Sequence, residues 1–334
     1  MERIVTRKRS IILMAMLMVC FTVRLYCGKN SGPVPENKAA ILRVEKILNN
    51  GYKAVAPISL SNESNITIRG DSINGGSNYC IQLYNCKNIY IINCKLQNSK
   101  LCGVYANGCT GITFDSCYMS NAGLGFTAVK SSGIGVYNSQ FLNMTGGQYS
   151  GDYVQFNNVT GANNAIENNK CQNNLGESNP EDGVSLYQSN GTAPSPIIIS
   201  NNWIKGYGTS TSGSGIMTGD GGGSYQKVTG NILVNTGNVG IGCAGGSNIT
   251  VSNNEVYSAS NPVSNVGIYV NNYSGAACSL ITVNGNKVTW INKSGQNNPA
   301  WNSNTCGTVN GWGTNNWNAG LTAGILPGNI VTAP

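Results

Sequence analysis

The residues best suited to chemistry lie near the middle of the chain, in two short phrases that resemble each other. Residues 151–154 (GDYV) and 181–184 (EDGV) both place an aspartate two positions before a valine. If the phrases occupy consecutive turns of a repeat, the two aspartate backbones lie about 5 Å apart. Two carboxylates this close share a proton, bind a cation such as Ca²⁺, or lean on a lysine. Asp152, Glu181 and Asp182 are therefore candidate calcium ligands. Turn capping by backbone hydrogen bonds is the alternative.

Other polar residues near these phrases complete a candidate site. Tyr187 is a candidate proton donor or stacking platform. Lys227 is a candidate base, and Lys130 and Lys205 are expected to flank the site, although each lysine alone also fits a solvated surface. The candidate substrate-binding residues are Gln155, Asn157, Gln188, Lys205 and Asp220.

A repeat must position these residues. The phrase Asn-Ile-Thr-Val-x-x-Asn-x-Val recurs, most clearly at residues 248–256. Its fourth position is apolar in every copy, and the ninth position is apolar in every copy as well. The fourth-position residues are Ile68, Ile91, Phe114, Val136, Ile166, Ile199, Val228, Val251 and Val283. A unit near 23 residues with several short strands predicts a solenoid of parallel strands, each coil pairing with its neighbours.

Two further columns support this register. The position three residues after each fourth-position residue holds a small turn-forming residue, and in the last five copies this residue is asparagine. This column predicts side-chain amides stacked from coil to coil. A second strand phrase carries apolar pairs two residues apart, from Ile81/Leu83 to Ile268/Val270. The residues between and beyond these pairs face outward, and long insertions flank them in the middle coils. We therefore expect a groove over Val154, Val184 and Ile216.

The ends of the chain predict four segments: a signal peptide at 1–27, a cap at 28–60 with a short helix over 37–48, the solenoid at 61–290, and a capping tail at 291–334. Basic residues precede an apolar run at 11–23, which is typical of export. Cys27 is a possible lipid anchor. Removing the leader deletes five basic residues and one acidic residue, so the formal charge falls from +7 to +3.

The cysteines follow the same repeat. Cys94 and Cys117 are 23 residues apart, as are Cys86 and Cys109, which favours stacked core thiols over disulfides. Cys278 and Cys306 lie outside this pattern and are the expected disulfide.

The repeat over roughly residues 61–290 resembles the pectate-lyase-like superfamily of right-handed parallel β-helix proteins, and more narrowly the β-helical lyases of polyuronates such as alginate. The resemblance implies an all-β, right-handed parallel β-helix of about nine coils. It also implies a tyrosine and lysine as acid and base, which fall on Tyr187 and Lys227. Two branches of the superfamily fit poorly. Pectate lyases that use a groove arginine as base are a poor match, because only Arg43 and Arg69 lie beyond the leader. Pectin hydrolases carry a Gly-His-Gly signature, and this chain has no His.

The preferred hypothesis is a secreted or cell-surface polysaccharide lyase that cleaves an acidic polysaccharide by β-elimination, with Ca²⁺ as a candidate cofactor. One alternative is a glycoside hydrolase that uses Asp152 and Asp182, and another is a non-catalytic carbohydrate-binding solenoid. An epimerase is not separable from a lyase by sequence. Scattered lysines predict no nucleic-acid partner, and a monomer is expected.

Overall fold

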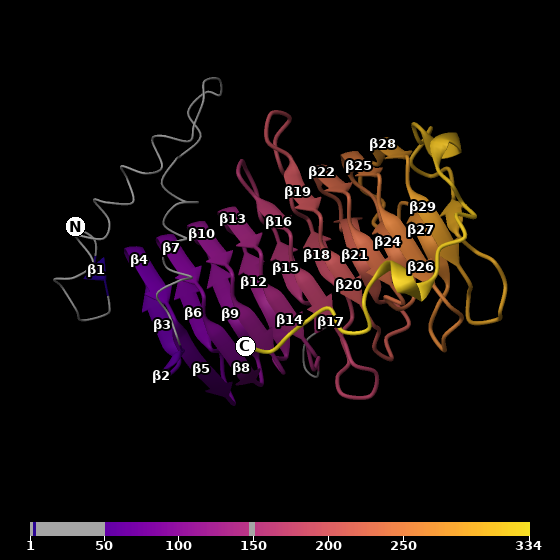
Figure 1. The fold of residues 1–334 in the computed structure, drawn as a ribbon. Coiled ribbons are helices and arrows are strands. Elements are labelled where there is room, and N and C mark those ends of the chain that lie inside the picture. The colour runs from indigo at the N-terminus through magenta and orange to yellow at the C-terminus, as the bar shows by residue number, and fades with distance from the viewer. Residues whose placement is uncertain (1–2, 5–50, 147–150) are drawn as a thin grey trace, which may run out of the picture.

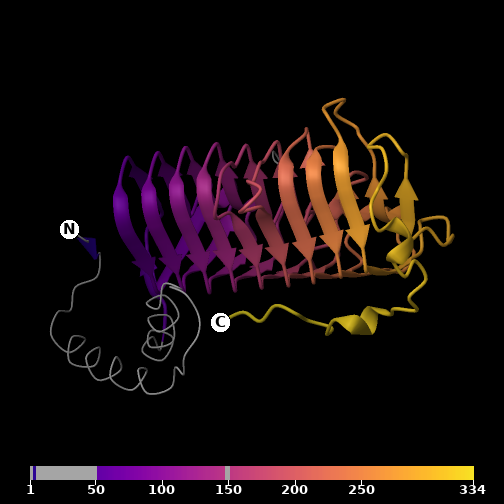
Figure 2. The ribbon, with the colours of Figure 1, turned by 90° about the horizontal axis from the view of Figure 1, so that it is seen from above.

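The computed structural model describes residues 3–4, 51–146 and 151–334. In this part of the chain, three parallel sheets of ten strands each run along one axis. Figures 1 and 2 show the strands stacked coil upon coil into a solenoid. The chain visits the three sheets in a fixed order, so each coil contributes one strand to each sheet. The fold is an all-β, right-handed parallel β-helix, as predicted.

The strands of each sheet are short, and most have between three and six residues. The first sheet, sheet A, contains β1 (Arg3–Ile4), β4 (Ser64–Arg69), β7 (Lys87–Ile92), β10 (Thr110–Asp115), β13 (Ser132–Tyr137), β16 (Ala165–Glu167), β19 (Ile197–Ser200), β22 (Ser224–Thr229), β25 (Ser247–Ser252) and β28 (Ser279–Asn284). Sheet B contains β2 (Lys53–Val55), β5 (Asp71–Gly76), β8 (Lys95–Ser99), β11 (Tyr118–Ser120), β14 (Gln140–Leu142), β17 (Lys170–Gln172), β20 (Trp203–Lys205), β23 (Ile232–Val234), β26 (Glu255–Ser258) and β29 (Lys287–Trp290). Sheet C contains β3 (Ile58–Ser61), β6 (Ile81–Tyr84), β9 (Cys102–Asn107), β12 (Leu124–Val129), β15 (Val154–Asn157), β18 (Val184–Tyr187), β21 (Ser214–Asp220), β24 (Val239–Cys243), β27 (Val266–Val270) and β30 (Ala300–Asn302).

The predicted register is confirmed strand by strand. The nine fourth-position residues pair with one another along sheet A, the ninth-position residues pair along sheet B, and the second strand phrase forms sheet C. The paired apolar side chains are buried in one continuous core. Alternation along each strand therefore sends every second side chain inward and leaves its neighbours facing out.

The predicted asparagine column is also present. Asn169, Asn202, Asn231, Asn254 and Asn286 lie fully or almost fully buried. Each accepts hydrogen bonds from the coil before it and donates to the coil after it, and the column continues to Asn315. In the earlier coils Cys94, Cys117 and Ser139 hold the same positions. The side chains of Cys117 and Ser139 accept the backbone N–H of the residue one coil earlier, and Asn169 accepts that of Ser139. Buried amides stacked this way satisfy the turn between sheets A and B.

The cysteine predictions hold as well. Cys86, Cys94, Cys109 and Cys117 are free and buried. Cys278 and Cys306 form a disulfide.

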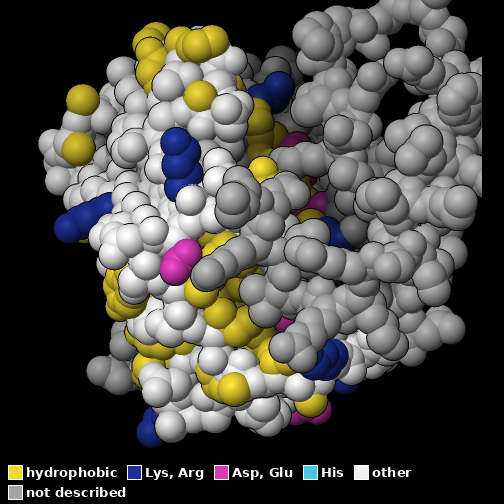
Figure 3. All heavy atoms as spheres, turned by 90° about the vertical axis from the view of Figure 1, so that its left-hand side faces the viewer, with side chains coloured by type: hydrophobic (Ala, Val, Ile, Leu, Met, Phe, Trp, Pro, Cys, Tyr) yellow, Lys and Arg dark blue, Asp and Glu magenta, His cyan; other side chains and the backbone are white. Residues whose placement is uncertain are grey.

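The two ends differ from the predicted boundaries. The solenoid begins before residue 61, because β2 and β3 already pair with the next coil. Val55, Ile58 and Leu60 of this first coil pack partly buried against the core. Figure 3, which views the molecule from this end, shows hydrophobic side chains at its surface. The predicted helix at 37–48 lies outside the described residues, and so does nearly all of the predicted leader. No helix in the described ranges is long and apolar enough to span a membrane.

The C-terminal tail does more than cover the last coil. Two short 3₁₀ helices, η1 (Trp312–Thr314) and η2 (Ala323–Ile325), lead into an extended segment that runs back along the solenoid (Figure 2). Leu326, Ile330 and Val331 of this segment pack with Tyr118 and Val234 of sheet B. The tail therefore covers an apolar stripe on the outer face of that sheet.

Candidate functional site

The outer face of sheet C carries a polar pocket of about 260 Å³ in the middle coils. Its walls come from β15, β18, β21 and the turns that lead into them. The lining residues are Asp152, Gln155, Asn157, Glu181, Asp182, Ser185, Tyr187 and Asp220. The pocket lies over Val154, Val184 and Ile216, where the groove was predicted.

Asp152 and Asp182 occupy equivalent positions in adjacent coils, as the register predicts. They are buried rather than open to solvent, with exposed fractions of 1% and 9%. Strict alternation would point both side chains into the core, but it breaks just before the strands of sheet C, where a Cβ on Gly183 or Gly215 would meet the core residues Ile204 and Leu233. In later coils Val239 and Val266 hold the position of Ser214 and pack with Met217 and Tyr269 on the outer face. Asp152 and Asp182 therefore lie on the pocket side of the sheet although little of either is exposed.

The two carboxyls take part in a ladder of backbone hydrogen bonds. Asp152 Oδ1 accepts the N–H of Asp182 at 3.1 Å, and Asp182 Oδ1 accepts the N–H and Oγ–H of Ser214 at 2.7 and 2.6 Å. Gln155 donates to Asp152 Oδ2 at 2.9 Å. The turn-capping interpretation is thus correct for these atoms. Within the described residues, Asp182 Oδ2 has no hydrogen-bond partner, so this oxygen is left to the pocket.

Burial and neighbouring charge perturb two of these acids. Burial raises the pKa of Asp182 well above the ordinary value of 3.8, and the nearby Asp152 and Glu181 charges raise it further against the opposing Ser214 hydrogen bonds. The pKa of Asp220 is also raised, by burial and by Glu181, while the Gly221 N–H opposes the shift. Of these two acids, Asp182 has the larger upward shift in pKa and so favours its protonated form more strongly.

A bulge brings Asp220 into the pocket. The regular register places Asp220 beside Gln188, one position beyond Tyr187. In the structure the register shifts after Ser185, and Asp220 pairs with Tyr187. Gly219 makes this possible with φ of 62°, and a Cβ there would lie 2.1 Å from the Gly245 carbonyl oxygen. An L side chain does not fit, so the glycine sets the position of the carboxylate.

The predicted lysines lie elsewhere. Lys227 belongs to β22 in sheet A, whereas Tyr187 belongs to β18 in sheet C, so the structure does not bring this pair together. Lys205 is in sheet B, where its Nζ donates to the carbonyls of Pro327 and Gly328 at 2.7 Å. It holds the C-terminal tail rather than the pocket.

Lys130 and Gln188 occupy the turn that follows sheet C. Both have left-handed backbone conformations, with φ of 46° and 47°. The Lys130 side chain is exposed, and neither residue lines the pocket. All the predicted site residues that do line it are uncharged or acidic, and none of the eight lining residues is basic.

Asp152, Glu181 and Asp182 were predicted as calcium ligands, and all three line the pocket. Among the described residues, no three His, Cys, Asp or Glu side chains are grouped so that they could hold a metal ion. Oδ1 atoms of Asp152 and Asp182 accept backbone N–H groups, and Glu181 Oε1 accepts the Ser212 hydroxyl at 2.6 Å. One oxygen of each carboxyl is therefore engaged within the protein.

Two serines were missed as site residues. Ser185 lines the pocket, and Ser214 holds Asp182. Ser214 stands two residues before Ile216, in the register of Asp152 and Asp182. The position of Ser214 in the same column as Asp152 and Asp182 was the sequence feature that could have identified it.

The fold and the comparisons agree on the class of protein. The family described as "Right handed beta helix region" matches residues 56–222, half of the chain. The chain belongs to this right-handed β-helix family.

Several solved structures are similar to this chain at low identity. The Dettilon tailspike protein is 14% identical with a TM-score of 0.46, and the alignment covers 77% of this chain and 59% of that one. A mutant tailspike protein of E. coli bacteriophage HK620, in complex with a pentasaccharide, is 13% identical with a TM-score of 0.42 and coverages of 83% and 61%. This chain thus spans about 60% of the tailspike chains that it matches. Similarity at this level does not indicate what the chain binds. No curated protein matches the sequence.

Proposed function

We propose that this protein is an exported glycoside hydrolase that uses the acids of the sheet C pocket. The observation that carries the proposal is the Asp182 carboxyl, whose pKa is raised well above 3.8 while its Oδ2 faces the pocket without a partner among the described residues. A carboxyl whose pKa is raised by burial and by a neighbouring carboxylate is suited to general acid catalysis. The Cys278–Cys306 disulfide supports export to an oxidising compartment.

The roles follow from the environment of each acid. Asp182 donates its proton to the oxygen of the scissile glycosidic bond as the bond between that oxygen and the anomeric carbon breaks. Asp220 has the smaller upward shift and a more open position, so it acts as the carboxylate. It takes a proton from the water that attacks the anomeric carbon. Gln155, Asn157 and Tyr187 line the walls and are placed to hydrogen-bond sugar hydroxyls.

The charge of the pocket favours hydrolysis over elimination. A lyase must neutralise the carboxylate of a uronate before a base removes the neighbouring proton. Four acids and no basic residue line this pocket, and Lys227 lies in another sheet. A polyuronate lyase remains the second candidate, because Tyr187 is 36% exposed in the pocket beside two amides and is a candidate base there.

The test compares the wild type with Asp182→Asn on neutral polysaccharides and on polyuronates. Asparagine keeps the oxygen that accepts from Ser214, so the ladder should survive. Wild type should release reducing ends without an unsaturated product, and Asp182→Asn should lose about 10²–10⁴-fold in rate. Glu255→Gln, an acid of sheet B paired with Lys287, is the matched control and should keep full activity.

Two other results would contradict the proposal. Ultraviolet absorbance from an unsaturated product on a polyuronate would select the lyase. Binding of a polysaccharide without turnover by the wild type would select a non-catalytic solenoid.

A further inference from the structure

A cluster of aromatic side chains lies on the same outer face of sheet C, toward the C-terminal end. Tyr269 in β27 pairs with Trp301 in β30, and their ring centroids are 6.4 Å apart. Tyr273, just after β27, meets the Tyr269 ring edge-on at 5.7 Å. We call Tyr269, Tyr273 and Trp301 the aromatic platform. Tyr273 and Trp301 are 65% and 44% exposed, while Tyr269 is buried beneath them.

The aromatic platform reaches the sheet C pocket, which we also call the carboxylate pocket, through Met217. The Tyr269 ring lies across Gly242 of β24, where a Cβ would be 2.8 Å from the ring, and its hydroxyl donates to Met217 Sδ in β21 at 3.3 Å. Met217 neighbours Ser185 of the pocket in the sheet. Burial raises the pKa of Tyr269, and the neighbouring Tyr273, Asp182 and Asp220 raise it further.

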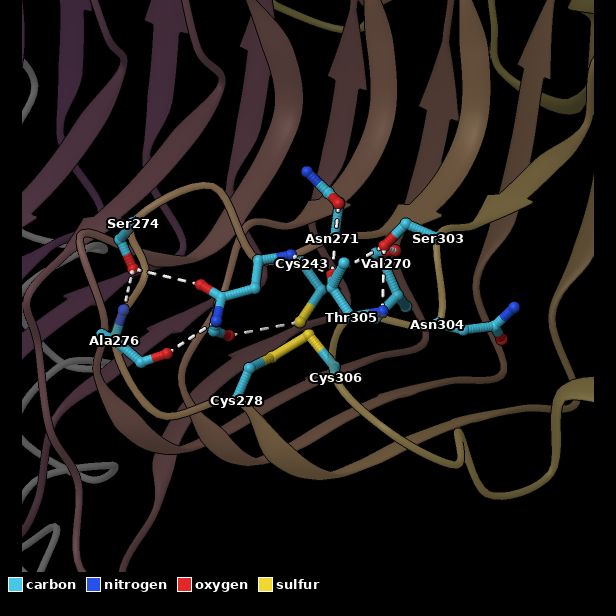
Figure 4. The surroundings of a disulfide bond; sticks show 12 residues. Cys243, Val270, Asn271, Ser274, Ala276, Cys278, Ser303, Asn304, Thr305 and Cys306 are labelled. Atoms are coloured by element: carbon cyan, nitrogen blue, oxygen red, sulfur yellow. Dashed lines mark hydrogen bonds between the residues drawn. A yellow bond between two sulfur atoms is a disulfide. The ribbon is translucent and has the colours of Figure 1, made fainter.

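Hydrogen bonds and a disulfide hold the loop that carries Tyr273, and this loop approaches Gly222 near the pocket. Asn272 donates to the Ala276 carbonyl at 2.6 Å, and the Thr305 hydroxyl accepts the Asn272 N–H at 2.8 Å. A Cβ on Gly222, two residues after Asp220, would lie 3.5 Å from Ala276 Cβ. The Cys278–Cys306 disulfide ties the base of this loop to the coil of Trp301 (Figure 4).

The segment that carries Tyr269 and Tyr273 is almost free of charged residues. Between residues 228 and 286 the sole charged side chain is Glu255, which belongs to sheet B. Exposed aromatic rings that are fixed in place and flanked by amides and hydroxyls suit ligands with one apolar face and polar edges. Sugar rings without carboxylates have this character, whereas a polyuronate would meet four acids in the pocket and no cation there.

We infer that the aromatic platform is a second binding site for the substrate, and that the substrate is a neutral polysaccharide lying along sheet C from the carboxylate pocket to Trp301. The inference rests on the proposed function for the place of cleavage. Three strand steps separate β18 from β27, or about 14 Å at roughly 4.8 Å per step, which requires a chain of several sugars rather than a disaccharide. Tyr273 and Trp301 stack on sugar faces, and Tyr269 supports them.

The test is affinity electrophoresis of full-length Asp182→Asn protein in native gels containing dextran, amylose or mixed-linkage β-glucan, with alginate and polygalacturonate in parallel. At least one neutral polysaccharide should retard the protein, and the polyuronates should not. Trp301→Ala and Tyr273→Ala should each weaken that retardation about tenfold. Trp301→Phe should restore most of it. Leu175→Ala is the matched control, because Leu175 is also exposed and apolar but follows β17 of sheet B.

The inference is overturned if the platform variants bind like the parent, if no neutral polysaccharide binds, or if only polyuronates bind. Its failure is distinguishable from failure of the proposed function. Hydrolysis of a neutral polysaccharide with KM unchanged by Trp301→Ala would contradict the platform as a binding site and support the hydrolase function. Binding that depends on Trp301, with no turnover by the wild type, would support the platform and contradict the hydrolase function.

Discussion

At the residue scale, Asp182 combines burial beside a second carboxylate with hydrogen bonds that favour its charged form. Burial and repulsion outweigh the hydrogen bonds and raise the pKa of Asp182. The folded chain therefore holds the Asp182 proton at pH values where the unfolded chain has released it. The group therefore stabilises the fold fully below the ordinary pKa of 3.8, and this contribution is lost as the pH rises through the higher folded pKa.

The pH dependence of unfolding tests this balance. The free energy of unfolding of the wild type should fall as the pH rises above 3.8, and Asp182→Asn should remove part of that fall because asparagine does not titrate. The measurement is denaturant unfolding from pH 4 to 8, with Glu255→Gln as the control that keeps the wild-type slope. Parallel curves for wild type and Asp182→Asn would show that the carboxyl is ionised throughout.

At the scale of the elements, the asparagine column joins successive coils through fully buried amides. Asn231 Oδ1 accepts two bonds from Asn202, and its Nδ2 donates to the Ile199 carbonyl at 3.0 Å. Asn231→Ala leaves the buried Asn202 N–H without an acceptor, so we expect a loss of about 2–4 kcal/mol in unfolding free energy. Chemical denaturation measures it.

The control for this variant comes from the solvent side of sheet A. Thr110 and Ser132 share an exposed hydroxyl hydrogen bond at 3.3 Å, also between adjacent coils. Thr110→Val should change the unfolding free energy by no more than about 0.5 kcal/mol, because water replaces the lost bond. Equal losses for Thr110→Val and Asn231→Ala would mean that burial does not give the column its importance.

The strand register could be predicted from sequence because the core alternation repeats at every coil. The apolar columns from Ile68 to Val283 required only that inward positions be apolar. The orientation of one sheet relative to another could not be predicted in the same way. Lys227 follows the 220s loop closely in sequence, yet the bend between β21 and β22 carries it to sheet A and away from Tyr187. The bulge at Gly219 likewise depends on the close approach of the Gly245 carbonyl, which no local pattern reveals.

At the scale of the whole molecule, the C-terminal tail connects coils that are far apart in sequence. Gln172 accepts the Ile330 N–H at 2.7 Å, and Gln140 accepts the Thr332 N–H at 2.8 Å. A capping role was expected for residues 291–334, but the return along sheet B was not. The apolar residues on the outside of this sheet, among them Tyr118 and Val234, show no periodicity that distinguishes a covered face from an exposed one.

Deletion of residues 322–334 tests the role of the tail. It removes Leu326, Ile330 and Val331 and should uncover the apolar stripe of sheet B, so that the protein binds a hydrophobic dye and aggregates. Dye fluorescence and light scattering measure both effects. Lys205→Ala is the control, because it removes the polar bonds to Pro327 and Gly328 and leaves the apolar contacts in place. A truncated protein as soluble as the wild type, without dye binding, would contradict this role.

The position of the tail also orders events during synthesis. A ribosome makes the chain from its first residue to its last, and each coil can stack on the one before as soon as it emerges. Leu326, Ile330 and Val331 leave the ribosome about two hundred residues after Tyr118, so Tyr118 stays uncovered while that length of chain is translated. The nascent protein therefore carries an uncovered apolar face during this interval. Any chaperone that escorts it should bind that face and be released once Leu326, Ile330 and Val331 have emerged.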